Sequence, residues 1–173
     1  AVVVKIEHKM GFKGSATCVI ALGANGPCRG WLIGEEGDGM RIMFHMMNHA
    51  RIGVGIQGLA TGAAAFQNAI SYAKERVQGT KVADFKNADA KRVAIVAHPD
   101  VRRMLHFMKV YIELSRSLLY TNAFRADTLH HGLVDDPDFH KGVIDLITPI
   151  CKAHITDLSF EVCRLAVQTY GGY

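Results

Sequence analysis

A repeat of apolar and small residues between residues 40 and 79 predicts one extended helix. From residue 52 onward these residues recur at alternating steps of four and three, the spacing that puts side chains on one face of an α-helix. The positions are Ile52, Ile56, Leu59, Ala63, Phe66, Ile70, Ala73 and Val77. Gly79 follows as a residue that readily adopts a left-handed helix stop. A face this long needs a partner along its whole length, so the pattern predicts a helical bundle.

Two further helices follow from similar patterns. His98-Pro99-Asp100 starts the second, with Pro in the first turn, and this helix is expected to end near residues 130–132. Asp136-Pro137 starts the third with Asp136 as N-cap, and Pro149 is expected to kink it. The two apolar faces are Val101, Leu105, Met108, Ile112, Ser115 and Leu119, then Ile144, Ile147, Cys151, Ile155, Leu158, Val162 and Leu165. Short connections predict an up-down-up arrangement, with any fourth helix beyond the end of this chain.

The first 35 residues predict short β-strands instead of helix. Apolar runs at residues 2–6, 16–22 and 31–33 are separated by glycine-rich segments. Residues 34–39 (GEEGDG) form an acidic turn whose charges suit the start of the long helix. We therefore expect a mainly α fold in two parts. Residues 1–35 are the remnant of a larger β-structure, and residues 36–173 are a helical-bundle domain that is incomplete at its C-terminus, as expected for a fragment.

Composition narrows the classes of function. The 49% hydrophobic and 21% charged residues are typical of a globular protein, and a net charge of +4 gives nucleic-acid binding little support. Residues 52–70 are uncharged, but Gly, Ala and polar residues dominate them, which favours a helix buried in protein over a membrane span. The cysteines lack CxxC spacing and are expected to be buried or partly buried free thiols in a reducing compartment: Cys18, Cys28, Cys151 and Cys163.

The motifs that could carry chemistry each have a structural alternative. Residues 53–58 match GxGxxG, but the dinucleotide fingerprint needs a preceding strand, so close helix packing through Gly58 and Gly62 is favoured. His45 and His49 could hold a metal, although partly buried or interface histidines explain them better. A second possible ligand group straddles a turn and a helix cap, which explain its aspartates: His130, His131, Asp135, Asp136, Asp138 and His140. Glu113 and Glu161 could be buried bases, but helix-surface carboxylates are the default.

Several segments together resemble the flavin-dependent acyl-CoA dehydrogenases. They are GWLIGEE at residues 30–36, MFHMMNHARIG at 43–53, YAKERVQG at 72–79, HPDVRRM at 98–104 and QTYGG at 168–172. In order, they resemble the junction between the middle β-domain and the C-terminal helical domain, and then that helical domain itself. The resemblance covers essentially the whole chain and is greatest to the long branch that includes 3-methylmercaptopropionyl-CoA dehydrogenase.

The resemblance implies an FAD enzyme that oxidises the α–β bond of an acyl-CoA thioester. In this family a glutamate takes the α proton, the β hydride passes to the flavin, and an electron-transfer flavoprotein or similar acceptor reoxidises it. It also implies a homo-oligomer, either dimer or tetramer, in the bacterial cytoplasm or another reducing compartment. The alternative is a non-catalytic scaffold or interaction module that has kept the same fold.

The resemblance also assigns residues to sites. Arg76 and Gln78 fall where the family contacts the FAD pyrophosphate and adenosine, commonly from a neighbouring subunit. Gln168, Gly171 and Gly172 fall on the family's Gln-x-x-Gly-Gly motif beside the flavin cofactor. Residues 47–51 match the stretch that lines the acyl pocket, in which the expected substrate-binding residues are Met47, Asn48, Ala50 and Arg51.

Two departures from the family pattern concern the catalytic base. Some branches place the glutamate just before the arginine, where this chain has Ala50. Most others place it shortly after the Gly-Gly motif, which predicts a base beyond Tyr173. We therefore expect this chain alone to be catalytically inactive and to bind FAD weakly or not at all.

Overall fold

The structure, a computed structural model, describes residues 1–172, so that Tyr173, the last residue of the predicted helical domain, lies outside the described residues. The chain divides into two compact units, Ala1–Ile42 and Met43–Tyr173. The predicted domain boundary between residues 35 and 36 stays a prediction.

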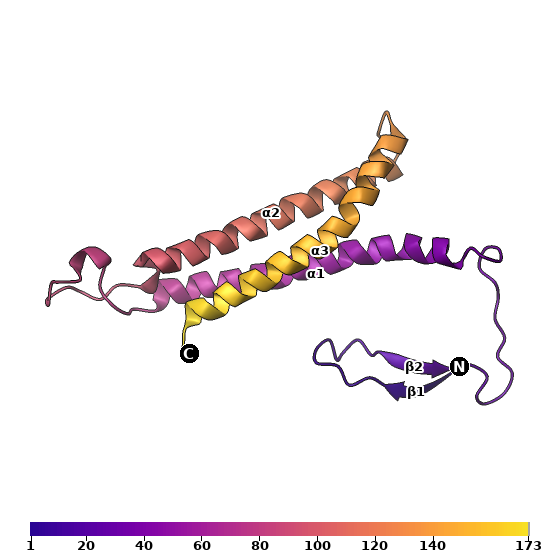
Figure 1. Cartoon of the computed structure of the whole chain (residues 1–173), viewed down its shortest axis with the longest axis horizontal. Coiled ribbons are helices and arrows are strands. Elements are labelled where there is room, and N and C mark those ends of the chain that lie inside the picture. The colour runs from indigo at the N-terminus through magenta and orange to yellow at the C-terminus, as the bar shows by residue number, and fades with distance from the viewer. Residues whose placement is uncertain (173) are drawn as a thin grey trace. The chain divides into compact units, whose positions relative to one another are not determined.

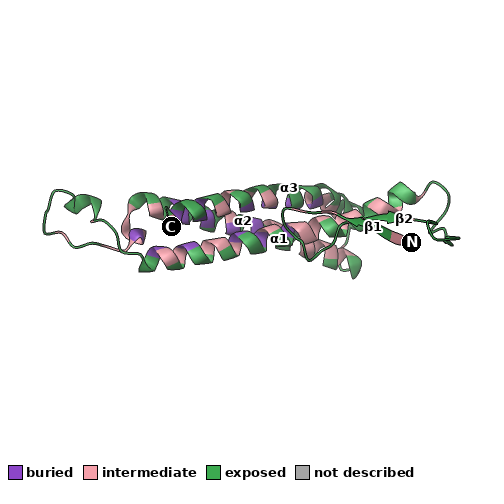
Figure 2. Ribbon diagram, turned by 90° about the horizontal axis from the view of Figure 1, so that it is seen from below, coloured by how far each residue is buried: buried purple, intermediate pink, exposed green. Residues whose placement is uncertain are grey.

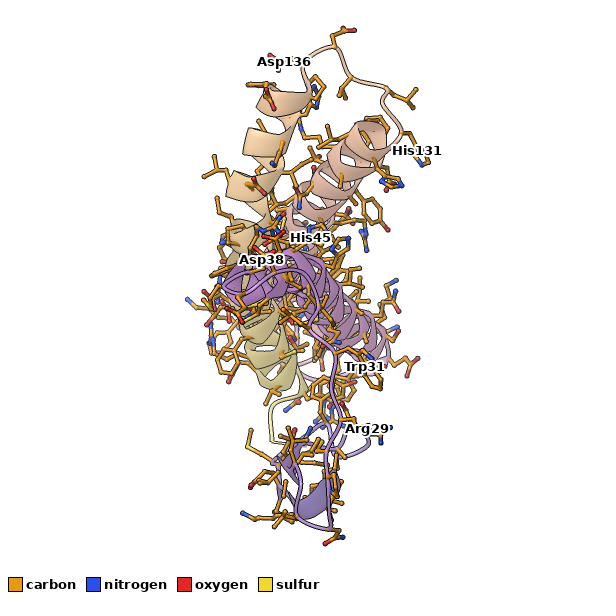
Figure 3. All side chains as sticks on the ribbon, turned by 90° about the vertical axis from the view of Figure 1, so that its right-hand side faces the viewer. Arg29, Trp31, Asp38, His45, His131 and Asp136 are labelled. Carbon is orange, nitrogen blue, oxygen red and sulfur yellow. The ribbon has the colours of Figure 1, made fainter. Side chains whose placement is uncertain are left out.

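The first unit contains an antiparallel pair of strands, β1 (Val2–Ile6) and β2 (Cys18–Ala21). Ile6 pairs with Cys18, and an irregularity in register follows Val3. The third predicted apolar run, residues 31–33, is wrong as a strand, because this segment is irregular and the Trp31 side chain is 85% exposed. Trp31 lies on the extended segment that leads away from the sheet (Figure 3). A two-stranded sheet is too small to build a core that would bury such a run.

The acidic turn starts the first helix, α1 (Gly39–Glu75), as predicted. The Asp38 carboxylate accepts hydrogen bonds from Nη2 of Arg41 at 2.8 Å and from the backbone N–H of Glu35 at 3.2 Å. The Arg41 guanidinium and then the Glu35 N–H hold the pKa of Asp38 below its ordinary value, because both stabilise the ionised carboxylate.

The second unit is an up-down-up bundle formed by most of α1 with α2 (Pro99–His130) and α3 (Pro137–Tyr170), as Figure 1 shows. Both later helices begin as predicted, with Pro in the first turn. Oδ1 of Asp136 accepts a hydrogen bond from the N–H of Phe139 at 3.0 Å and so caps α3. Helix α3 continues through Pro149 and is bent in its orange first half (Figure 1), which agrees with the predicted kink.

Buried residues line the facing sides of the three helices (purple in Figure 2). The predicted faces of α2 and α3 are confirmed, with Met108, Ile155 and Val162 fully buried. The predicted face of α1 is wrong in part, because Ile56 is 51% exposed. Small residues occupy most of its core positions instead, and the buried set is Gly55, Leu59, Gly62, Ala69 and Ala73. The helices approach closely here, which leaves larger side chains at the edges of the contact.

The GxGxxG segment is part of this contact, as the packing interpretation predicted. A Cβ added to Gly58 would lie 3.4 Å from Cα of Thr156 on α3, and one added to Gly55 would lie 3.5 Å from Cδ1 of Leu119 on α2. Because these glycines have no side chain, the backbone of α1 can approach the neighbouring helices closely.

The end of α1 differs from the prediction. The helix stops at Glu75, so Val77 is not on its apolar face and Gly79 is not its stop signal. The backbone from Arg76 onward pairs with a later segment instead, and Gly79 takes a left-handed conformation with φ of 73° within that pairing. Two 3₁₀ turns, η1 (Val82–Asp84) and η2 (Ile95–Ala97), lie in the connection to α2.

Candidate functional site

A short antiparallel pairing follows α1 and presents two of the predicted cofactor residues. The N–H of Ile95 donates to the carbonyl of Arg76 at 2.8 Å, and the N–H of Gln78 donates to the carbonyl of Val93 at 3.0 Å. The N–H of Val93 donates to the carbonyl of Gly79 at 2.9 Å. In extended backbone, residues two apart point to the same side. Arg76 and Gln78 therefore share one side of this pairing, and both line a cleft.

The cleft has a volume of about 820 Å³ and lies at the end of the bundle where α1 and α3 finish and α2 begins. Its lining residues are Tyr72, Arg76, Gln78, Gly79, Ile95, His98, Val101, Thr169, Tyr170, Gly171 and Gly172. The fold thus brings together four of the five predicted cofactor residues from two distant segments. The exception is Gln168, whose side chain is exposed and whose carbonyl accepts the N–H of Gly171 at 3.2 Å.

Gly171 ends α3 in a conformation that favours glycine. Its φ is 69° and its ψ is −130°, a combination that an L side chain rarely adopts. Apart from the glycine itself and its neighbours in the chain, no atom of the described residues lies within 4 Å of a Cβ built on Gly171 or on Gly172. The conformation requires glycine at position 171, while at both positions the bare backbone leaves open space on the cleft.

Two tyrosines hold the ends of α1 and α3 together beside the cleft. The rings of Tyr72 and Tyr170 stack with centroids 4.3 Å apart and an interplanar angle of 20°. The hydroxyl of Tyr170 donates to the carbonyl of Asn68 at 3.3 Å. This contact places the Gly171-Gly172 backbone next to the segment that carries Arg76 and Gln78.

His98 lines the same cleft and is a residue that the sequence motifs do not assign to any site. Its Nε2 forms a 2.7 Å hydrogen bond with the carbonyl of Gln78, and a Cβ added to Gly79 would lie 3.4 Å from the His98 ring. The sequence could indicate only part of the role of this residue. His98 directly precedes Pro99 at a helix start, yet only the folded chain brings it to Gln78.

The charge of the cleft suits an anion. Its lining contains no Asp or Glu among the described residues, and Arg76 supplies a guanidinium that can pair with phosphate oxygens. Helix α2 begins at the cleft, and no side chain of residues 1–172 caps its N-terminus, the positive end of the helix dipole. Asp100 in this first turn forms an ion pair with Arg103 at 2.7 Å, which offsets its negative charge.

The predicted substrate-binding residues lie elsewhere, on the first part of α1. Met47, Asn48 and Arg51 are half-buried, and Nη1 of Arg51 donates to Oδ1 of Asn48 at 3.0 Å. Ala50 is exposed and offers only a methyl group. At 1.5 Å per residue, roughly 36 Å of helix separates Arg51 from Glu75. One copy of the chain therefore does not bring the predicted substrate-binding residues to the cleft.

The fold brings no additional ligand to either of the two histidine groups that could have held a metal ion. The rings of His45 and His49 have centroids 5.7 Å apart, and His131 and Asp136 flank the connection between α2 and α3 (Figure 3). Among residues 1–172 no group of three His, Cys, Asp or Glu side chains is arranged to hold a metal ion.

No described helix is long and apolar enough to cross a membrane.

The cysteines are free thiols in different environments. Cys151 is fully buried in the bundle, and burial raises the pKa of its thiol. Cys18 and Cys163 are partly buried. Cys28 is exposed, which corrects the expectation of burial, because its segment between sheet and helix has no core to enter.

The fold is a helical bundle, and at one end of the bundle lies a cleft whose described lining contains no Asp or Glu. Similarity to known proteins identifies the family of this domain. The acyl-CoA dehydrogenase C-terminal domain matches at residues 37–89 and 82–173. A butyryl-CoA dehydrogenase of Syntrophomonas wolfei is 40% identical over 174 residues, covering 97% of this chain and 28% of that protein. The 3-methylmercaptopropionyl-CoA dehydrogenase of Ruegeria pomeroyi is 38% identical over 169 residues, covering 98% of this chain and 28% of that protein.

The solved structure of butyryl-CoA dehydrogenase from Megasphaera elsdenii is similar with a TM-score of 0.63 and 29% identity, over 81% of this chain and 30% of that one. This chain belongs to the acyl-CoA dehydrogenase family, as the sequence resemblance predicted. It spans less than a third of the length of these relatives.

Proposed function

We propose that this chain is the part of an FAD-dependent acyl-CoA dehydrogenase that holds one end of the cofactor and part of the acyl pocket. The complete enzyme would oxidise the α–β bond of an acyl-CoA thioester. One observation carries the proposal: four residues that the family motifs assign to the cofactor, Arg76, Gln78, Gly171 and Gly172, line a single cleft. Gln168 is the weakest of the proposed cofactor residues, because it is not among the residues that line the cleft.

The residues of the cleft fit the pyrophosphate and adenosine end of FAD. Arg76 would pair with phosphate oxygens, and Gln78 would offer an amide donor and acceptor. The bare backbone at Gly171 and Gly172 leaves room for close approach of the cofactor. A volume of about 820 Å³ falls within the roughly 300–1,000 Å³ usual for ligand sites. When bound, FAD would supply the two-electron redox chemistry.

The separation of the two candidate sites along α1 supports a homo-oligomer. Met47, Asn48, Ala50 and Arg51 would contact the acyl-CoA, at the opposite end of the helix from Arg76. One copy would then serve its own acyl pocket with one end of α1 and a neighbour's cofactor with the other. An electron-transfer flavoprotein or similar acceptor would reoxidise the enzyme. The free thiols support a reducing compartment such as the bacterial cytoplasm.

The catalytic glutamate stays a prediction. Ala50 cannot act as a base, which favours the other family position, shortly after the Gly-Gly motif and beyond Tyr173. The alternative function is a non-catalytic module with the same bundle, and a gene that encodes no glutamate at that place would favour it.

The proposal is tested by the visible absorption spectrum of the complete gene product before and after addition of acyl-CoAs. We expect a flavin spectrum that is bleached by at least one straight-chain or methylmercapto acyl-CoA. Flavin without bleaching would contradict the proposed substrate class. Folded protein without flavin would contradict the enzyme and favour the non-catalytic module.

A further inference from the structure

His98 occupies a special place beside the cleft, because it touches the backbone that presents Arg76 and Gln78. The carbonyl of Gln78 is not used in the backbone pairing with residues 93–95, and His98 Nε2 reaches it at 2.7 Å. With a proton on Nε2, the imidazole donates this hydrogen bond. The bond joins the start of α2 to the segment that follows α1 across 20 positions of sequence.

The ring of His98 also fixes the end of this segment sterically. It lies against Gly79, where a Cβ would come within 3.4 Å of both Cε1 and Nε2 of the ring. The left-handed φ of 73° at position 79 already favours glycine there. Backbone conformation and ring contact together restrict how residues 78 and 79 can lie.

We propose that His98 is a positioning residue for cofactor binding, which holds the Arg76–Gln78 segment so that both side chains point into the cleft. The inference rests on the proposed function of the cleft as an FAD site. His98 acts through the Gln78 carbonyl, so its effect on affinity passes through the side chains of Arg76 and Gln78.

Two substitutions in the complete gene product separate this role from a general structural one. His98→Phe keeps a ring against Gly79 but removes the donor, while His98→Gln keeps an amide N–H at similar reach. Apoprotein is titrated with FAD and the dissociation constant is taken from quenching of flavin fluorescence. We expect His98→Phe to weaken FAD binding roughly three- to tenfold, the range for one hydrogen bond, and His98→Gln to restore most of the affinity.

A double-mutant cycle supplies the readout that a merely structural residue would not move. In an Arg76→Ala/Gln78→Ala background, His98→Phe should cause little further loss of FAD affinity, because the side chains it positions are gone. Should His98→Phe fail to fold, His98→Asn takes its place, since its shorter amide cannot reach the Gln78 carbonyl. Hydrogen exchange at the Gln78 and Val93 amides should be faster in either variant, with or without FAD.

The outcomes distinguish the two proposals. Wild-type protein that binds no FAD overturns the proposed function and this inference with it. Wild-type binding with undiminished affinity in folded His98→Phe overturns this inference alone. An equal loss in the wild-type and Arg76→Ala/Gln78→Ala backgrounds also overturns it, because His98 would then act independently of those side chains.

Discussion

Gly62 on α1 lies so close to Ile112 on α2 that a Cβ at position 62 would come within 2.9 Å of Cδ1 of Ile112. The same glycine faces Ser159 on α3, with Oγ 3.5 Å from that Cβ position. Position 62 is therefore one of the places where all three helices of the bundle meet, and the side chain it lacks leaves the space that Ile112 fills.

Substitution of Gly62 by Val should destabilise the bundle by about 1–3 kcal/mol, the usual cost of overpacking a core. Urea denaturation followed by circular dichroism measures the change. Gly53→Ala is the control, because outside the adjacent backbone of α1 no described atom lies within 4 Å of its Cβ position, and Ala favours helix over Gly by about 1 kcal/mol. Equal effects of the two substitutions would refute the close three-helix contact.

A buried polar pair in the bundle gives a second stability prediction. Nδ2 of Asn122 donates to Oγ1 of Thr148 at 3.1 Å, and both residues are almost fully buried. Among residues 1–172 no donor reaches Oδ1 of Asn122. Thr148→Val should cost about 1–3 kcal/mol by leaving the Asn122 amide unpaired, and Asn122→Leu in the same chain should recover much of it.

Urea denaturation of the two single variants and the double variant forms the test of this pair. We expect the double variant to be more stable than the sum of the single changes predicts. Strict additivity would mean that the hydrogen bond contributes little to the fold.

The sequence predicted the helices of this fold better than their contacts. Apolar spacing located three helices, and the Pro and Asp start signals placed two of their ends, because both features act locally. Spacing alone could not tell that Gly55 would be buried while Ile56 stayed exposed, since that depends on how closely α3 approaches. It also could not end α1 at Glu75, because the residues that follow are drawn into pairing with residues 93–95.

The candidate site shows the same division. Arg76 and the two glycines belong to motifs that extend over a few residues, so the sequence alone could indicate them. His98 and the Tyr72–Tyr170 stack could not be predicted in this way, because their roles depend on partners far away in the sequence.

The stability of the start of α1 should depend on pH, because the ionised Asp38 carboxylate contributes to it. Its pKa is lowered in the fold by Arg41 and the Glu35 N–H, so its stabilising contribution is present above the unfolded pKa and is lost as pH falls through the folded pKa. Arg41→Ala should raise the pKa of Asp38 toward its ordinary value, as measured by NMR titration of the carboxyl carbon. Arg29→Ala, a change in the same unit, should leave it in place.

The thiols should differ in reactivity toward an aromatic disulfide reagent at mildly alkaline pH. Cys28 is exposed and should react first, while Cys151 should react last, since burial both shields its thiol and raises its pKa. Release of the coloured thiolate measures the phases, and Cys151→Ser should remove the slowest one. In denaturant all four cysteines should react alike. A slow phase that survives Cys151→Ser would contradict the burial of this thiol.

Arg76 should contribute most to the FAD affinity that we propose for the cleft. Arg76→Gln in the complete gene product should weaken binding by about tenfold or more, because a charged hydrogen bond to phosphate contributes roughly 1.5–3 kcal/mol. Arg76→Lys should recover only part of the loss, since it keeps the charge without the planar fork. Flavin fluorescence titration gives the constants, with Lys74→Gln on exposed α1 surface as control. Equal affinity in Arg76→Gln and Lys74→Gln would remove Arg76 from the site.

Helix α1 runs without a break between the two candidate sites. Its length therefore fixes both the distance between the sites and the rotation of one relative to the other. Each residue of a helix adds about 1.5 Å and about 100° of rotation. Deleting a single residue between Arg51 and Gly55 would turn one candidate site by more than a quarter turn relative to the glycine contact with α3. Whatever side chains its surface carries, the number of residues in α1 sets the rotation of one candidate site relative to the other.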